Sequence, residues 1–165
     1  MAIADALVSE FDHEMAVTRT VLERVPFDNP TWAPHEKSMT LKRLATHVAT
    51  LPNWAMHTMG VSEFDLGADG YKPPDLKSAD ELVAEFDKHV ADARAALASA
   101  SDADFMAPWT FRNGETVFFT MPKASVIRSF MMNHSIHHRG QLTVYLRLLD
   151  VPLPSVYGPT ADTQI

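Results

Sequence analysis

Residues 122–150 read PKASVIRSFMMNHSIHHRGQLTVYLRLLD, and this stretch indicates the fold most strongly. Apolar side chains recur there every three or four residues, at Val126, Ile127, Phe130, Met131, Leu142, Tyr145 and Leu149. This spacing places them on one face of an α-helix. Pro122 is favourable at the start of such a helix, because its missing N–H would have no partner in the first turn anyway. The stretch therefore predicts a long helix that packs against other helices.

Three further segments show the same helical spacing of apolar residues. They run from Ile3 to about Val25, from Leu41 to Ala55 and from Ser78 to about Ser101. The last of them opens with the sequence SADE, which fits a capping box. Four helices of this length predict an all-α four-helix bundle, with first and third connections long enough to cross it.

Departures from helical spacing predict the breaks between these segments. Pro52 cannot donate its backbone hydrogen bond, so we expect a kink or a break between Thr50 and Trp54. Residues 60–77 hold three glycines and two adjacent prolines and predict a long loop. Before the last helix, residues 109–119 read WTFRNGETVFF, which predicts a small β-hairpin around Asn-Gly.

Length and composition limit the class of protein. The chain has 165 residues, 46% of them hydrophobic, so we expect residues 1–165 to form one domain. The formal net charge is -7 and no basic stripe is present, which disfavours nucleic acid as a partner. No apolar run is long enough to span a bilayer, and the first residues lack the features of a signal peptide. We therefore expect a cytoplasmic protein without membrane contact.

The chain contains no cysteine but has eight histidines. The absence of cysteine excludes disulfides, thiolate zinc sites, iron–sulfur clusters and thiol nucleophiles. His134 and His138 are four residues apart, so both project from one face of the last helix. His47 lies on the apolar face of the second helical segment, where it could supply a third imidazole. Three imidazoles predict a metal site with an open coordination position, because structural zinc sites are usually closed by four ligands.

The alternative is that these histidines form a hydrogen-bonded core cluster without metal. A metalloprotease is disfavoured. The zinc-protease motif HExxH requires Glu directly after the first histidine, whereas Ser135 and Ile136 follow His134. His137 is three residues from His134, and this spacing also makes the two residues neighbours on a helix. The spacing alone therefore does not decide whether His137 or His138 is the ligand.

Other residues carry weaker indications of a site. Arg139 could bind an anionic substrate or a carboxylate, or lie on a solvated face; Gln141 could orient water or a histidine. Tyr157 could bring its hydroxyl near the metal, or simply pack the tail. Four aromatic residues could line a cleft or belong to the core or a dimer interface: Trp54, Trp109, Phe118 and Phe119. No catalytic base can be assigned, although several groups could reach the cleft: Asp12, His13, Glu14, Glu85 and His89.

Three segments together resemble the DinB/YfiT-like family over nearly the whole chain. They are LKRLATHV at 41–48 followed by Trp54, HSIHHRGQL at 134–142 and VPLPSVYGP at 151–159. The HxxxHRGQ segment is the most specific of them. The resemblance implies a four-helix bundle and assigns a divalent metal, commonly zinc or nickel, to His47, His134 and His138. It makes His137 a neighbour rather than a ligand, and it implies a homodimer.

The resemblance also implies the class of reaction. Characterised members of the family resemble thiol-dependent transferases and isomerases that use small cytosolic thiols. We therefore expect a metal-dependent enzyme that acts on a small-molecule substrate, with a low-molecular-weight thiol as co-substrate. A metal-dependent hydrolase is the variant in which water is the nucleophile. The alternative from another class is a non-enzymatic metal- or ligand-binding stress protein.

Overall fold

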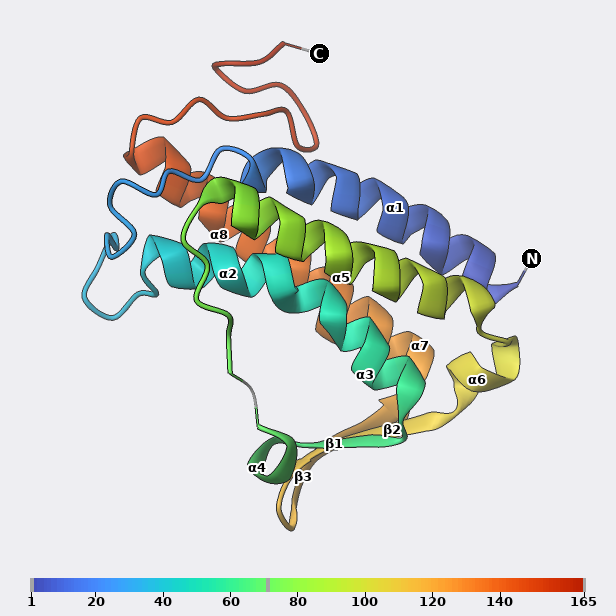
Figure 1. Cartoon of the computed structure of the whole chain (residues 1–165). Helices are drawn as coiled ribbons and strands as arrows, with labels where there is room; N and C mark the ends of the chain where they lie inside the picture. The colour runs from blue at the N-terminus through green and yellow to red at the C-terminus, as the bar shows by residue number, and fades with distance from the viewer. Residues whose placement is uncertain (1, 71, 165) are drawn as a thin grey trace.

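The chain is mostly helical and carries one small sheet, in a computed structural model that describes residues 2–70 and 72–164 (Figure 1). The helical elements are α1 (Ile3–Leu22), α2 (Leu41–Thr50), the 3₁₀ turn η1 (Leu51–Asn53), α3 (Trp54–Gly60), α4 (Leu66–Asp69), α5 (Ala79–Ser99), α6 (Asp102–Met106), α7 (Lys123–Ser125), the π-helical segment η2 (Val126–Met132) and α8 (Asn133–Leu148). The strands are β1 (Glu63–Asp65), β2 (Pro108–Asn113) and β3 (Thr116–Pro122).

The helices share one core, in which α5 packs against α1, α2 and α3, and α8 packs against α1 and α2. The fully buried side chains include Phe11 of α1, Leu44 of α2, Phe86 of α5 and Leu142 of α8. Figure 1 shows these helices side by side, with the sheet at the end where α3 and α7 lie. The apolar helix faces that the sequence predicted are therefore the faces that pack against one another in the core.

Among the described residues, the helical elements are more numerous than the four helices expected. The second helical segment breaks at Pro52, where η1 separates α2 from α3, as the sequence predicted. The last segment is also divided, because its turns from Val126 to Met132 are π-helical. A π-helix bonds each residue to the fifth one along, and such turns often lie at functional sites. Apolar spacing did not predict this change in helical pitch.

Side chains fix where the helices begin. Thr40 accepts a hydrogen bond from the N–H of Arg43 over 3.3 Å at the start of α2. Ser78 accepts one from the N–H of Glu81 over 3.1 Å, so α5 begins at the predicted capping sequence. Each bond satisfies one N–H that has no partner inside the helix. The register of α2, which carries His47, is set in this way.

The predicted hairpin is present as β2 and β3, which pair antiparallel around Gly114 at φ 57°. The expectation that residues 60–77 form only a loop is wrong in part, because β1 and α4 lie within them. β1 pairs in parallel with β2, with Phe64 opposite Phe111. The Asp65 carboxylate also accepts hydrogen bonds from the N–H groups of Gly67 and Gly114, both at 3.0 Å. These partners are distant in sequence, so local composition did not predict the strand.

The tail after α8 is irregular, as expected, and folds back along α1 (Figure 1). Arg147 forms an ion pair with Asp162, and Arg24 donates to the carbonyl of Pro152 over 2.9 Å. Within the described part of the chain, no helix combines the length and apolar character needed to cross a membrane.

Candidate metal centre

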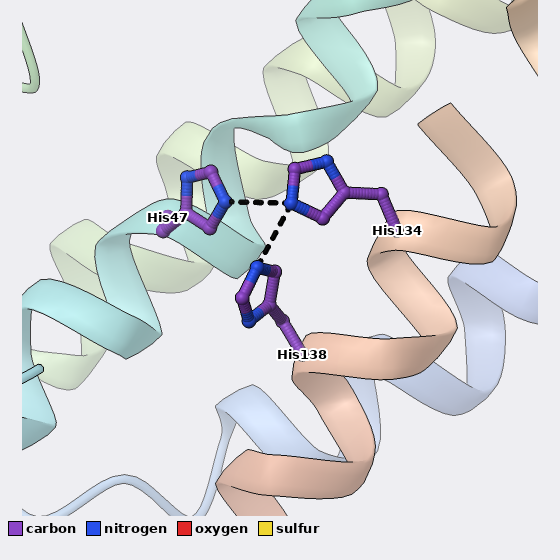
Figure 2. A group of neighbouring side chains, drawn as sticks. All are labelled: His47, His134 and His138. Carbon is purple, nitrogen blue, oxygen red and sulfur yellow. Dashed lines mark hydrogen bonds between the residues drawn. The ribbon is translucent and has the colours of Figure 1, made fainter. Parts of the chain in front are cut away.

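His47, His134 and His138 meet between α2 and α8 (Figure 2). Nε2 of His134 lies 2.8 Å from Nε2 of His138 and 3.3 Å from Nε2 of His47. One ligand atom from each of the three side chains lies within 4.8 Å of the others. Figure 2 shows the three rings pointing toward one another, one from α2 and two from successive turns of α8. The structure therefore brings together the three histidines that the sequence singled out.

Gln141 lies directly behind His138 and fixes its tautomer. Its Oε1 accepts a hydrogen bond from Nδ1 of His138 over 2.7 Å. Because Nδ1 carries the proton, Nε2 presents a lone pair to the centre of the group. Of the two roles predicted for Gln141, orienting a histidine is the one that this contact supports.

The backbone carbonyl of Phe130 acts on the His134 ring. It favours the protonated ring and so partly opposes the lowering of the pKa of His134 by burial. Phe130 lies in η2, so the π-helical segment supplies this carbonyl.

All three imidazoles are held neutral by their surroundings. The pKa of His47 is lowered to about 4, mainly because burial disfavours the charged ring, and next because His138, His134 and Arg43 would repel it. Burial is also the main cause that lowers the pKa of His134 and of His138. Neutral imidazole is the form that binds a metal, so all three rings are in the ligating state at pH 7.

The donor set fits a divalent cation. The hydrogen bond from Nδ1 of His138 to Gln141 turns the Nε2 lone pair of His138 toward Nε2 of His134, 2.8 Å away. Tetrahedral zinc with Zn–N bonds of about 2.0–2.1 Å would place its nitrogens about 3.3 Å apart. The His47–His134 separation of 3.3 Å already has this value. Among the described residues, no fourth His, Cys, Asp or Glu joins the group.

A hollow opens beside the centre at His47. It has a volume of about 430 Å³ and is lined by Met39, Arg43, His47 and Pro73. This volume is in the range of small-molecule sites, which is about 300–1,000 Å³. A larger cavity, about 780 Å³, lies elsewhere, between the start of α1 and the α7–η2 region, and His47, His134 and His138 do not line it. Of the three imidazoles, the hollow is lined by that of His47.

Aromatic rings form a wall on the other side of His134. The Phe130 ring contacts His134 with centroids 6.0 Å apart and continues into Trp54, Phe111 and Phe119. Of the four aromatic residues that the sequence proposed, Trp54 and Phe119 belong to this wall. Trp109 is fully buried beneath it, and Phe118 is half exposed.

Of the alternatives for Arg139, the structure supports a carboxylate partner and not a solvated face, because the side chain is buried and its donors are used within the protein. Its Nη2 lies 2.8 Å from the Glu14 carboxylate, and its Nη1 donates to Thr18 Oγ1 over 3.1 Å. The Tyr157 hydroxyl donates to the Glu14 carboxylate over 2.8 Å and accepts from Arg139 over 2.7 Å. The predicted Tyr157 hydroxyl thus fastens the tail to α1 and α8.

The groups considered as a general base are mostly engaged elsewhere. Glu14 is taken by Arg139 and Tyr157, Asp12 by Arg94, and Glu85 pairs with His89 over 3.0 Å. His13 is exposed on α1. None of them belongs to the three-histidine group, so the described residues assign no base.

With this geometry in view, comparison with known proteins identifies the family. The family model for the DinB family matches residues 1–164. The chain belongs to the DinB family. A DinB-like protein from Bacillus cereus ATCC 10987 superposes with a TM-score of 0.71 at 23% identity, covering 93% of this chain and 97% of that one. The DinB-like protein YjoA from Bacillus subtilis gives 0.69 at 18% identity, covering 97% and 99%. At these identities the likeness shows a shared fold.

One curated relative matches a shorter stretch. The uncharacterized protein YrdA of Bacillus subtilis (strain 168) is 40% identical over 42 residues, which is 26% of this chain and 25% of that protein. The match therefore spans about a quarter of the relative's length. Membership of the DinB family rests on the family model, and the three-histidine group is compatible with a metal-binding member.

Two neighbours of the centre were not predicted from the sequence of this DinB-family chain. Phe130 acts through its backbone carbonyl, which no side-chain pattern could indicate. Arg43 lines the hollow one helical turn before His47, and this four-residue spacing was available in the sequence.

Proposed function

We propose that this DinB-family protein is a divalent-metal-dependent enzyme that acts on a small molecule, with His47, His134 and His138 as the metal ligands. The observation that carries the proposal is the geometry of these rings, whose Nε2 atoms converge while the hydrogen bond to Gln141 holds His138 in the ligating tautomer. Zinc and nickel are the metals that we expect.

The proposed reaction is group transfer or isomerisation with a low-molecular-weight thiol as co-substrate. A divalent metal held by three imidazoles would lower the pKa of a bound thiol or water toward neutrality. The chain has no cysteine of its own, so a thiol nucleophile must come from a bound molecule. The hollow at His47 offers space for such a molecule. Hydrolysis, with water as nucleophile, is the variant that the same centre would support.

Two features favour an enzyme over a non-enzymatic metal- or ligand-binding stress protein. A structural zinc site would usually have four protein ligands, whereas the group found among the described residues has three. His47 and His134 are also partly accessible, although His138 is buried, and His47 lines the hollow. We further propose that the protein forms a homodimer and works in the cytoplasm.

The test begins with untagged protein purified without chelator. Elemental analysis should give about one equivalent of metal per chain. Metal-loaded protein is then assayed with 2-mercaptoethanol and 1-chloro-2,4-dinitrobenzene for thiol transfer, and with 4-nitrophenyl acetate for hydrolysis. We expect catalysed thiol transfer that is lost in His134→Ala and after chelation. Protein that cannot be loaded with zinc or nickel would overturn the proposal, and ester cleavage alone would favour the hydrolase.

A further inference from the structure

Arg43 holds a position beside the candidate metal centre that the proposed function leaves without a role. It lies four residues before His47 on α2, and successive turns of a helix place such residues on one face. Both side chains line the same hollow, together with Met39 and Pro73. Arg43 is also close enough to His47 to oppose protonation of that ring. A molecule in the hollow would therefore contact the guanidinium and lie against His47, one of the three histidines of the centre.

Arg43 differs from the other arginines in its contacts. Arg24 donates to a backbone carbonyl, and the remaining six are paired with carboxylates: Arg19, Arg94, Arg112, Arg128, Arg139 and Arg147. Among the side chains that the structure describes, at 2–68, 70 and 72–164, none forms an ion pair or hydrogen bond with the Arg43 guanidinium, which is exposed. Its five donors are available to a ligand.

The described residues that line the hollow include no carboxylate. Asp75, two residues beyond the lining residue Pro73, is paired with Lys42 at 2.6 Å and with Lys77. These two lysines lower the pKa of Asp75 to about 2, so its charge is already balanced. In a chain of net charge -7, the described lining of this hollow therefore presents positive charge and no negative charge.

The chemistry of the guanidinium defines the ligand. Its planar donors match a carboxylate or phosphate in a two-point contact, and they cannot lose their charge at physiological pH. We infer that the hollow binds a small molecule with an anionic group, and that Arg43 holds this group beside the three-histidine centre. This inference rests on the proposed function, because it names the charge of the molecule that the metal centre would act on.

The test compares thiols that differ in the charge of their tail. Cobalt(II)-loaded protein is titrated with 3-mercaptopropionate and with 2-mercaptoethanol, and binding is followed by thiolate-to-cobalt absorption. Arg43→Gln should weaken 3-mercaptopropionate binding about 10-fold while leaving 2-mercaptoethanol unchanged. Arg43→Lys should recover part of the loss. Lys88→Gln is the matched control, because it removes one exposed positive charge on α5 outside the hollow.

The outcomes separate this inference from the proposed function. If cobalt binds in one equivalent but Arg43→Gln affects both thiols equally, or neither, the assignment of Arg43 is overturned and the metal centre stands. If cobalt does not bind, the proposed function fails. In that case, propionate is titrated into metal-free protein and its binding is followed by NMR. Propionate binding that is lost in Arg43→Gln supports the anion site. The absence of propionate binding overturns it. Circular dichroism checks that the variants are folded.

Discussion

Nδ1 of His138 lies 2.7 Å from Oε1 of Gln141, one turn further along α8. This contact makes Nδ1 the protonated nitrogen and turns the lone pair of Nε2 toward His134. The two residues belong to the same helix, so α8 supplies both the histidine and the side chain that orients it. Partners of this kind set both the direction and the basicity of a ligating imidazole.

Replacing Gln141 by Leu should lower zinc affinity by about 10- to 100-fold, because His138 would lose its orienting acceptor. Gln141 is exposed, so the fold should persist. Competition with a chromophoric chelator measures the affinity. Gln141→Glu, which keeps an acceptor at this position, is the control and should stay close to the wild type. Wild-type affinity in Gln141→Leu would show that this hydrogen bond does not support the centre.

His47→Ala should abolish stoichiometric metal binding, because two imidazoles from α8 alone leave the ion without its ligand from α2. His137→Ala should retain about one equivalent per chain, since His137 is exposed and lies outside the converging group. Elemental analysis after gel filtration distinguishes the two variants. Equal loss in both would mean that His137 is a ligand, and full retention in His47→Ala would remove His47 from the site.

Metal-free protein should lose stability as the pH falls from about 6.5 to about 4. In this range unfolded His47, with its ordinary pKa of 6.5, takes up a proton that the folded residue, with a pKa of about 4, does not. The unfolded state then binds more protons, so the free energy of unfolding decreases as pH decreases and levels off below about 4. The lowered pKa values of His134 and His138 act in the same direction.

Thermal unfolding in the presence of chelator, recorded at half-unit pH steps, measures this dependence. His47→Gln has no titrating group at the position and should show a shallower slope over the same range. Parallel curves for the wild type and the variant would show that His47 does not contribute.

Arg139→Met should destabilise the protein by about 3–5 kcal/mol, because it leaves the buried Glu14 carboxylate without its cation. Arg94→Met, which breaks an exposed pair with Asp12, should cost only about 0–1 kcal/mol. Urea unfolding at pH 7 measures both. The double variant Glu14→Gln/Arg139→Met should recover part of the loss, since no unpaired charge remains. Similar values for the two single variants would contradict a structural role for the buried pair.

Tyr157→Phe removes the hydroxyl that joins the tail to Glu14 and Arg139. We expect a loss of about 1–3 kcal/mol in the free energy of unfolding, because buried polar groups lose a partner. Limited proteolysis should also cut the tail faster. Metal content should not change, since Tyr157 contacts the arginine and the glutamate. Loss of metal in this variant would place the hydroxyl in the centre instead.

The sequence alone determined the features that depend on residues a few positions apart. Helical spacing located α1, α5 and α8, Pro52 ended α2, and Asn113-Gly114 marked the hairpin. The four-residue interval between His134 and His138 places both rings on one face of α8, because residues four apart in a helix lie on the same face.

Only the tertiary structure decided the relations between distant segments. Arg139 lies 125 residues from Glu14, and β1 became a strand because β2 lies beside it. Among the described side chains, Arg43 has no carboxylate partner, although the chain has more acids than bases. The pairing of charged side chains depends on how the whole chain packs, and no local stretch of sequence contains this information. The same packing brings His47 of α2 to the two histidines of α8.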